Sequence, residues 1–335
     1  NTYQQFDFTS NSTSNLSFNV NPPSESILVD RNVLLKTGLT FTIAIGSGAN
    51  GANIAPGVNI WQYGLREAFN AFPINSLFTT VTLSVNNTSV SINLQDVLPQ
   101  LLHLMDEEEI QKYRGFTPTM IDKYKYYSDA IASNNNPLAG YETAGYNRYC
   151  TPRGAHPLES VAIARFDAGA ADGTSPVSQA LTDSWVITVK SRFVEPLFIS
   201  PLLVHSKFNQ AAILGVNNMN LVCNVDAQMK RVFSSGLVGA LSYNLSLVSF
   251  DEPKLLFNFL SVQQNDLVNS KNIVPFVDFP RYITSANNTG TIDAGVYSGT
   301  GVFSPGSQTF SMNNIQINQI PDKFIIVVRP LLSQQ

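Results

Sequence analysis

Residues 72–105 place the strongest constraint on the fold, because two strand patterns and one helix pattern follow one another there. Residues 77–85 are rich in β-branched and aromatic side chains, and their apolar positions alternate with threonine and serine, as in a strand with one buried face. Residues 89–94 repeat the pattern, and Asn86 with Asn87 favours a tight turn between the two runs. The stretch therefore predicts a β-hairpin. Its inward positions are Val81, Leu83 and Val85.

A helix is predicted directly after this hairpin. Asp96 can cap its N-terminus, and Pro99 then falls in the first turn, where a missing N–H costs little. An apolar stripe at helical spacing follows, formed by Leu98, Leu101, Leu102 and Met105. A hairpin that leads into an amphipathic helix is typical of a structural scaffold and indicates no catalytic chemistry.

Strand patterns recur along the rest of the chain and predict a mostly-β protein. They occupy residues 27–35, 38–45, 184–194, 212–225, 240–250 and 254–262. Residues 60–72 have helical or mixed spacing, residues 106–140 indicate a short helix plus loop, and residues 139–180 indicate a turn-rich surface excursion. After a polar linker at 263–271, strand patterns resume at 273–283, 309–319 and 322–328. Residues 1–17 are polar and predict an arm with little structure of its own.

Composition excludes some classes of function. Only 13% of residues are charged, against roughly a quarter in typical proteins, so the polar surface must come from Asn, Ser, Thr and Gln. Such a surface suits a protein that contacts copies of itself. The net charge of −4 and the lack of a basic block argue against nucleic-acid binding.

The two cysteines and the apolar runs bear on where the protein is made. Cys223 lies in an apolar strand pattern and is interpreted as a small buried hydrophobe, although a pairing with Cys150 stays open. No apolar run reaches the length of a membrane span, and no signal peptide is recognisable, so we expect a soluble protein made in a reducing compartment. Glycosylation sequons begin at Asn11, Asn15, Asn86, Asn244 and Asn287, which an Asn-, Ser- and Thr-rich chain produces by chance.

Three local patterns resemble ligand sites, and each has a simpler interpretation. Residues 46–51 match G-x-G-x-x-G, but Pro56 and Gly57 prevent the helix that a dinucleotide site needs, so we expect a loop. His103 and Glu107 stand four residues apart and are interpreted as a solvated helix face rather than as metal ligands. Residues 167–174 lack the alternating oxygen ligands of a calcium loop. We therefore predict no catalytic residue, no metal site and no cofactor.

A cluster of three tyrosines, Tyr124, Tyr126 and Tyr127, has two open interpretations. Tyrosine is enriched at protein interfaces, so the cluster could form a binding face. It could equally pack an insertion onto the β scaffold.

The order of these features resembles a viral major capsid protein of the double jelly-roll type, the lineage that includes adenovirus hexon and tailless icosahedral viruses. The resemblance rests on PPSE and DRNVLL at residues 22–35, EPLFISPL at 195–202, GVNNMNLVCNV at 215–225 and IQINQIPDKFIIVV at 315–328. It implies an all-β fold with an antiparallel eight-stranded jelly-roll sandwich. The implied organisation is an N-terminal arm at 1–20, a first jelly roll at 21–262 with a helix-containing insertion at about 94–180, and a partial second jelly roll at 263–335.

The resemblance also implies a function and partners. The chain would be a structural, non-enzymatic capsid subunit that forms homotrimers and a capsid lattice with copies of itself, and it would be located in the virion. Contacts with other virion proteins, or with a membrane beneath the shell, stay open. The second jelly roll is incomplete in this sequence, so we expect either a longer product or another segment that completes it.

Two other classes of function compete with this interpretation. A β-sandwich module that binds a receptor or a glycan would have similar strand patterns. A sandwich-fold glycosidase would need two carboxylates across a cleft, and no acidic pair stands at convincing strand ends.

Overall fold

The computed structural model describes residues 2–47, 63, 68–119, 156–166, 184–202, 212–234 and 241–261, together with short stretches between 274 and 326. The chain divides into two compact units. One consists of Asn1–Asp278 with Pro330–Gln335, and the other is Phe279–Arg329.

The first unit is built mainly of strands, with three helices. Its strands are β1 (Thr2–Asn11), β2 (Asn15–Val20), β3 (Leu28–Val29), β4 (Leu34–Ser47), β5 (Ala68–Phe69), β6 (Phe78–Val85), β7 (Thr88–Ile92), β8 (Ser160–Phe166), β9 (Ser184–Pro196), β10 (Met219–Val225), β11 (Phe233–Ser234) and β12 (Leu241–Leu260). Its helices are α1 (Pro73–Leu77), α2 (Leu94–Leu104) and α3 (Glu107–Gln111).

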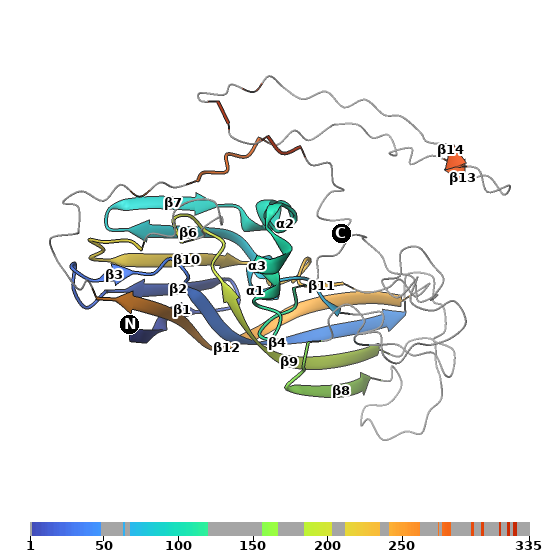
Figure 1. Ribbon diagram of the computed structural model, residues 1–335. Helices are drawn as coiled ribbons and strands as arrows, with labels where there is room; N and C mark the ends of the chain where they lie inside the picture. The colour runs from blue at the N-terminus through green and yellow to red at the C-terminus, as the bar shows by residue number, and fades with distance from the viewer. Residues whose placement is uncertain are drawn as a thin grey trace. The chain divides into compact units, whose positions relative to one another are not determined.

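Ten strands form one connected antiparallel sheet with the order β7-β6-β10-β2-β1-β12-β4-β9-β8, and β3 pairs with β12. Strand β1 joins the two halves of this sheet, because Thr2–Asp7 pair with β12 and Phe8–Asn11 pair with β2. Figure 1 shows β7, β6, β10 and β2 on one side of this connection and β4, β9 and β8 on the other. The predicted mostly-β, antiparallel fold is confirmed.

The described core is dominated by phenylalanine. Most of the fully or nearly fully buried rings belong to strands, while Phe72 is the N-cap of α1 and Phe198 follows β9. The buried rings are Phe18, Phe41, Phe69, Phe72, Phe78, Phe193, Phe198 and Phe257. Several rings meet edge to face, among them Phe69 with Phe193 at 5.1 Å between centroids. Such pairs add stability beyond the burial of their area.

The predicted hairpin at 77–94 is confirmed as β6 and β7, with Asn86 in the left-handed region at φ 53°. The helix start differs from the prediction. Helix α2 begins at Leu94, with Asn93 as its N-cap, so Asp96 lies in the first turn instead of capping it. Burial of Leu94 with the rest of the apolar stripe explains the earlier start. Before the hairpin, Pro73 begins the single-turn helix α1.

The expected lack of structure at residues 1–17 is wrong, since β1 and β2 occupy most of this segment. Polar strands can still form where the backbone pairs on both sides, and β1 pairs with β12 and β2. Phe6 provides an apolar anchor, because its ring packs edge-on against Phe257 and Phe259 at 5.5 and 6.2 Å between centroids.

Three boundaries inside the first unit also differ from the sequence patterns. The stretch expected to be a turn-rich excursion contains β8, which pairs with β9 along its length. The strands expected at 240–250 and 254–262 form the single strand β12, which passes the Glu252-Pro253 interruption through an irregular register. Within residues 60–72, the described part contains the short strand β5 and no helix.

In the second unit, β13 (Val296–Tyr297) pairs with β14 (Phe303–Ser304). The predicted strands at 273–283, 309–319 and 322–328 are not formed by those of their residues that the structure describes. Apolar side chains there are exposed, including Ile320 and Ile326. A strand needs a paired neighbour to satisfy its backbone groups, and these described residues have none.

Candidate functional site

Near its end, strand β9 carries a completely buried glutamate, Glu195. Its residues alternate between the two faces of the sheet, and Ile187, Val189 and Phe193 point to the buried face. Glu195 shares this parity and has no exposed surface. It stands opposite Leu35 of β4, which is also completely buried. A carboxyl group thus occupies a position that the strand pattern assigns to an apolar side chain.

Four donors converge on the Glu195 carboxylate. The backbone N–H of Ile74 donates to Oε1 and that of Asn75 donates to Oε2, each over 2.9 Å. The Asn75 side-chain Nδ2 donates to Oε2 over 2.7 Å, and the Thr117 hydroxyl donates to Oε1 over 3.0 Å. The carboxylate therefore joins β9, α1 and the segment around Thr117.

Helix α1 explains why two of these donors are available. The first N–H groups of a helix have no partner within it, and the N-cap residue often satisfies one of them. Here the N-cap is Phe72, which lies in the left-handed region at φ 52° and makes no side-chain cap. Glu195 takes this role from the neighbouring strand.

The charge state of Glu195 reflects two opposing effects. Burial raises its pKa to about 7 from an ordinary value of 4.5, while the four hydrogen bonds act in the opposite direction. Among the described residues, no cation forms an ion pair with it. This carboxyl group consequently changes its charge near neutral pH.

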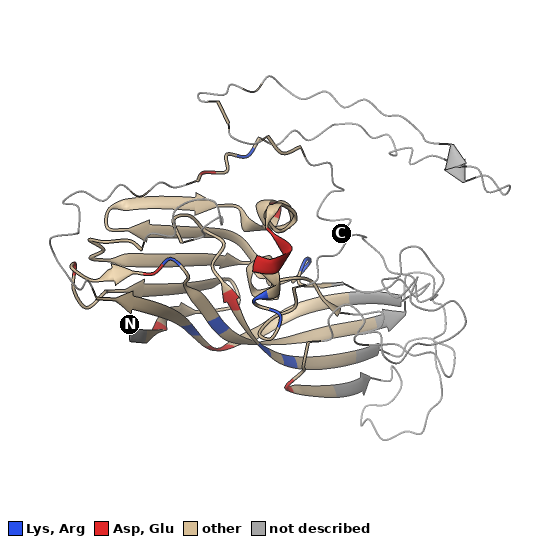
Figure 2. Cartoon of the chain, in the orientation of Figure 1, with Lys and Arg blue, Asp and Glu red and all other residues tan. Residues whose placement is uncertain are grey.

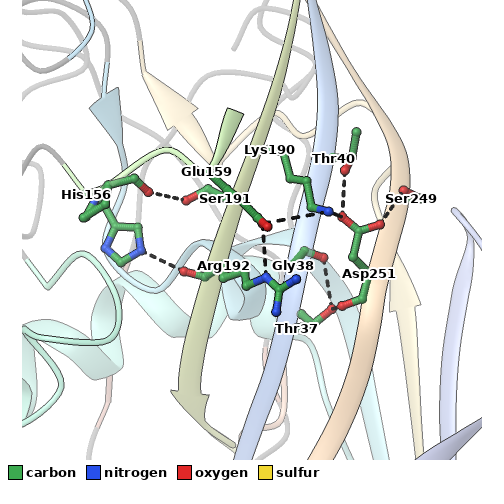
Figure 3. A network of polar contacts seen from close by, with 11 residues as sticks. Thr37, Gly38, Thr40, His156, Glu159, Lys190, Ser191, Arg192, Ser249 and Asp251 are labelled. Atoms are coloured by element: carbon green, nitrogen blue, oxygen red, sulfur yellow. Dashed lines mark hydrogen bonds and ion pairs between the residues drawn. The ribbon is translucent and has the colours of Figure 1, made fainter. Parts of the chain in front are cut away.

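The opposite face of β9 carries a charged network that crosses three strands (Figure 3). Lys190 lies 3.5 Å from an Asp251 oxygen of β12 and 3.8 Å from a Glu159 oxygen. The Arg192 Nε lies 3.1 Å from the same Glu159 oxygen. These pairs are partly or fully accessible to solvent, so screening by water leaves each of them only a small contribution to stability.

Asp251 is the most connected acid of this network. The Thr40 hydroxyl donates to its Oδ2 over 2.8 Å and the Ser249 hydroxyl donates to its Oδ1 over 3.1 Å. Partial burial acts to raise its pKa, but these hydrogen bonds and the charge of Lys190 outweigh burial and lower it. The group therefore stays ionised and, through Thr40, holds the irregular part of β12 against β4.

His156 links this network to the core. Its ring stacks on Phe193 at 4.8 Å between centroids, and its Nε2 lies 2.8 Å from the Arg192 carbonyl oxygen. A carbonyl only accepts, so Nε2 carries the hydrogen. Burial lowers the pKa of His156, which keeps the ring neutral.

Charges are distributed unevenly over the sheet. Strands β2, β6, β7 and β10 contain no charged residue, whereas β4, β9 and β12 do, as Figure 2 shows. The uncharged half instead presents rows of amides and hydroxyls. One such row runs across β6, β10 and β2 through Ser84, Asn220 and Asn19.

The features singled out in the sequence are not brought together into one site. His103 is exposed on α2 and Glu107 begins α3. Within the described ranges, no three His, Cys, Asp or Glu side chains are grouped to hold a metal ion. Residues 48–51 of the glycine-rich pattern, the tyrosine cluster at 124–127, the loop at 167–174 and Cys150 lie outside the described residues.

Other sequence interpretations can be compared directly with the structure. Cys223 is a free, completely buried thiol, as expected for a small hydrophobe, and burial raises its pKa. Asn86 uses its sequon side chain structurally, since it donates to the Gly215 carbonyl and accepts from the N–H of Asn217. None of the described helices has both the length and the hydropathy that a membrane crossing requires.

Sequence reasoning missed Glu195, although a signal for it was present. The alternation that begins at residue 185 assigns residue 195 to the inner face if it is continued to the end of the strand. The strand pattern predicted at 184–194 ends one residue before Glu195.

Comparison with known proteins gives two family matches. Residues 1–260 match the family described as Sputnik virophage major capsid protein 1st domain. Residues 279–335 match the family described as Major capsid protein V20 C-terminal domain.

Individual relatives agree with these matches. The protein V20 of Sputnik virophage, whose name describes it as a capsid protein, is 25% identical over 98% of this chain and 50% of its own length. The cryo-EM structure of Sputnik virophage contains a chain that is 22% identical, with a TM-score of 0.56 over 83% of this chain and 49% of that one. The mavirus major capsid protein is 13% identical, with a TM-score of 0.44 over 78% of this chain and 47% of that one. The chain thus spans about half the length of the relatives it matches.

Proposed function

This chain belongs to the family of the Sputnik virophage major capsid protein, and from this membership we propose that it is a structural capsid subunit that assembles with copies of itself. The observation that carries the proposal is the family match across residues 1–260. The virion capsid is the corresponding location.

We propose the following organisation for the chain. Residues 1–262 form a first jelly roll with an insertion at about 94–180, because β1 and β2 lie within its sheet and replace the arm expected at 1–20. Residues 263–335 begin a second jelly roll. The separate family match at 279–335 supports a second unit.

The uncharged half of the sheet is the surface that best suits contact with another copy. Two identical charged surfaces repel unless opposite charges are placed across from one another, and burying unpaired charges is costly. A surface of amides and hydroxyls avoids both costs and can form hydrogen bonds across the contact. We propose that the neutral row at Ser84, Asn220 and Asn19 belongs to the contact between subunits, in a trimer.

Mass measurement on the purified chain tests this function. We expect native mass spectrometry to find a species of three times the 36.7 kDa chain mass, and electron microscopy to find larger assemblies at high concentration. A folded protein that stays a monodisperse monomer under all conditions would contradict the proposal. Circular dichroism separates this outcome from misfolding.

A charge placed on the neutral row tests the proposed contact surface. Asn220→Lys should reduce the trimer fraction at least tenfold, because each contact between subunits would then bury an unpaired charge. Ser246→Lys is the matched control, since Ser246 is exposed on β12 in the charged half. Equal trimer fractions in the two variants would place the contact elsewhere.

The non-enzymatic role is also a proposal and follows from the structural nature of the family. The alternative of a receptor- or glycan-binding module gains no support from the family match, and no second function is proposed.

A further inference from the structure

Glu195 is a single ionisable group that connects the two halves of the sheet. Its own strand, β9, belongs to the half with β4 and β12, while α1 leads directly into β6 of the other half. The three hydrogen bonds from α1 and the one from Thr117 all end on this carboxyl group. We propose that Glu195 is a proton-operated switch: the junction is tight when this group carries a proton and is weakened when it ionises.

The hydrogen bonds to Glu195 favour its ionised form, whereas its burial favours its neutral form. All four hydrogen bonds are donated to the group, which suits the ionised form. The group is nevertheless completely buried and lacks an ionic partner among the described residues, which favours the neutral form. Because these two effects oppose each other, the pKa of Glu195 lies near neutral pH.

Thr117 can form a hydrogen bond with both the protonated and the ionised form of Glu195. The backbone N–H groups of Ile74 and Asn75 can only donate, and the Asn75 Nδ2 is held by the Pro196 carbonyl as well, over 3.0 Å. A hydroxyl can donate or accept. When Glu195 is protonated, Oε1 can donate to the Thr117 oxygen, and when it ionises, Thr117 donates to Oε1, so the direction of this one hydrogen bond reverses.

Among the residues that the structure describes, no charged group on the elements packed against Glu195 forms an ion pair with it. Helix α1 and residues 116–119 contain no ionisable side chain. The remaining groups on the packed elements have other contacts or face away: Lys36 is exposed on β4, Tyr113 donates to Asn32, Arg192 pairs with Glu159, and His156 contacts the Arg192 carbonyl. Arg31 is buried, but its Nε makes no hydrogen bond.

The direction of the pH effect follows from linkage. Burial raises the pKa of Glu195 from 4.5 to about 7, so the folded protein keeps a proton that the unfolded chain has lost between these values. The contribution to stability is fully present below pH 4.5 and is lost as the pH rises to about 7. His156 acts in the opposite direction, because burial lowers its pKa and the folded protein gains stability as the pH rises.

Chemical unfolding of the 335-residue chain between pH 4.5 and 8 tests the switch. The unfolding equilibrium constant of the wild type, divided by that of Glu195→Gln, should rise by up to about tenfold per pH unit below pH 7. The contribution of His156 cancels in this ratio. Glu159→Gln is the matched control, because Glu159 is an exposed glutamate, and its ratio to the wild type should stay constant over this window.

Two results would overturn the proposal. One is an equal pH dependence in the wild type and in Glu195→Gln. The other comes from ¹³C NMR of glutamate carboxyl groups, which needs no charge-removing variant: the proposal fails if no glutamate of the folded wild type titrates near pH 7. Thr117→Val, which retains the carboxyl group, should move that titration by at least half a pH unit, and an unmoved titration would also contradict it.

Discussion

The Thr117 hydroxyl donates to the Glu195 carboxylate over 3.0 Å, across 78 positions of the chain. This contact ties the end of β9 to the segment that follows α3, at the point where the same carboxylate holds the N-terminus of α1. The junction is entirely buried, since Thr117, Asn75 and Glu195 have no exposed surface. Its stability depends on the complete set of donors.

Glu195→Ala should lower the free energy of unfolding by about 3–5 kcal/mol, because it leaves buried donors of α1 and Thr117 without an acceptor. Guanidinium unfolding followed by circular dichroism measures the change. Glu159→Ala, at an exposed glutamate of the outer network, should cost at most about 1 kcal/mol. A similar loss in both variants would mean that the buried junction contributes little.

Leu83→Asp should abolish folding of the first unit, because Leu83 is buried on β6 and an unpaired carboxylate there would lose its hydration. His103→Ala should leave the free energy of unfolding within about 0.5 kcal/mol, since His103 is exposed on α2. Soluble yield and the two-dimensional NMR spectrum of each variant report the outcome. A folded Leu83→Asp protein would show that the hairpin is misassigned.

Asn86 combines an unusual backbone conformation with three hydrogen bonds to the loop before β10. Its side chain donates to the Gly215 carbonyl and accepts from the N–H of Asn217 and Asn218. Asn86→Gly keeps the left-handed conformation and loses only the side-chain bonds, so it should cost about 1–2 kcal/mol. Asn86→Ala should cost about 1 kcal/mol more, because alanine at φ 53° is strained. Thermal unfolding measures the difference, and equal costs would exclude the backbone effect.

Phe6 and Phe8 provide a matched pair of substitutions on β1. Phe6→Ala should cost about 2–3 kcal/mol, because the Phe6 ring packs on Phe257 and Phe259. Phe8→Ala should cost less than about 1 kcal/mol, since Phe8 is 42% exposed. Urea unfolding of both variants tests the order, and the reverse order would mean that β1 is not anchored by Phe6.

The sequence predicts those strands whose two faces differ in polarity. In β6, apolar and hydroxyl-bearing residues alternate, and the structure buries Val81 and Leu83 as expected. The end of β9 was not predicted correctly, because Glu195 breaks the alternation with a charged group. The partners that make this burial tolerable, Asn75 and Thr117, come from distant parts of the chain, which a local pattern does not contain.

Strand β1 was missed for a different physical reason. Its side chains are mostly polar and exposed, so no alternation marks it, and it is held mainly by backbone pairing with β12 and β2. Backbone pairing leaves no trace in local composition. Residues 324–326 show the converse, because their apolar composition suits a strand but these described residues belong to none.

The pairing of Thr2 with Phe259 has a consequence for synthesis on the ribosome. Strand β1 leaves the ribosome before β12, so the ladder between them cannot form until β12 has also emerged. The two halves of the sheet therefore cannot be closed by β1 until most of the unit has been translated. Contacts this distant in sequence slow folding and leave strand edges open in the meantime. Newly made chains should depend on chaperones until residue 259 has left the exit tunnel.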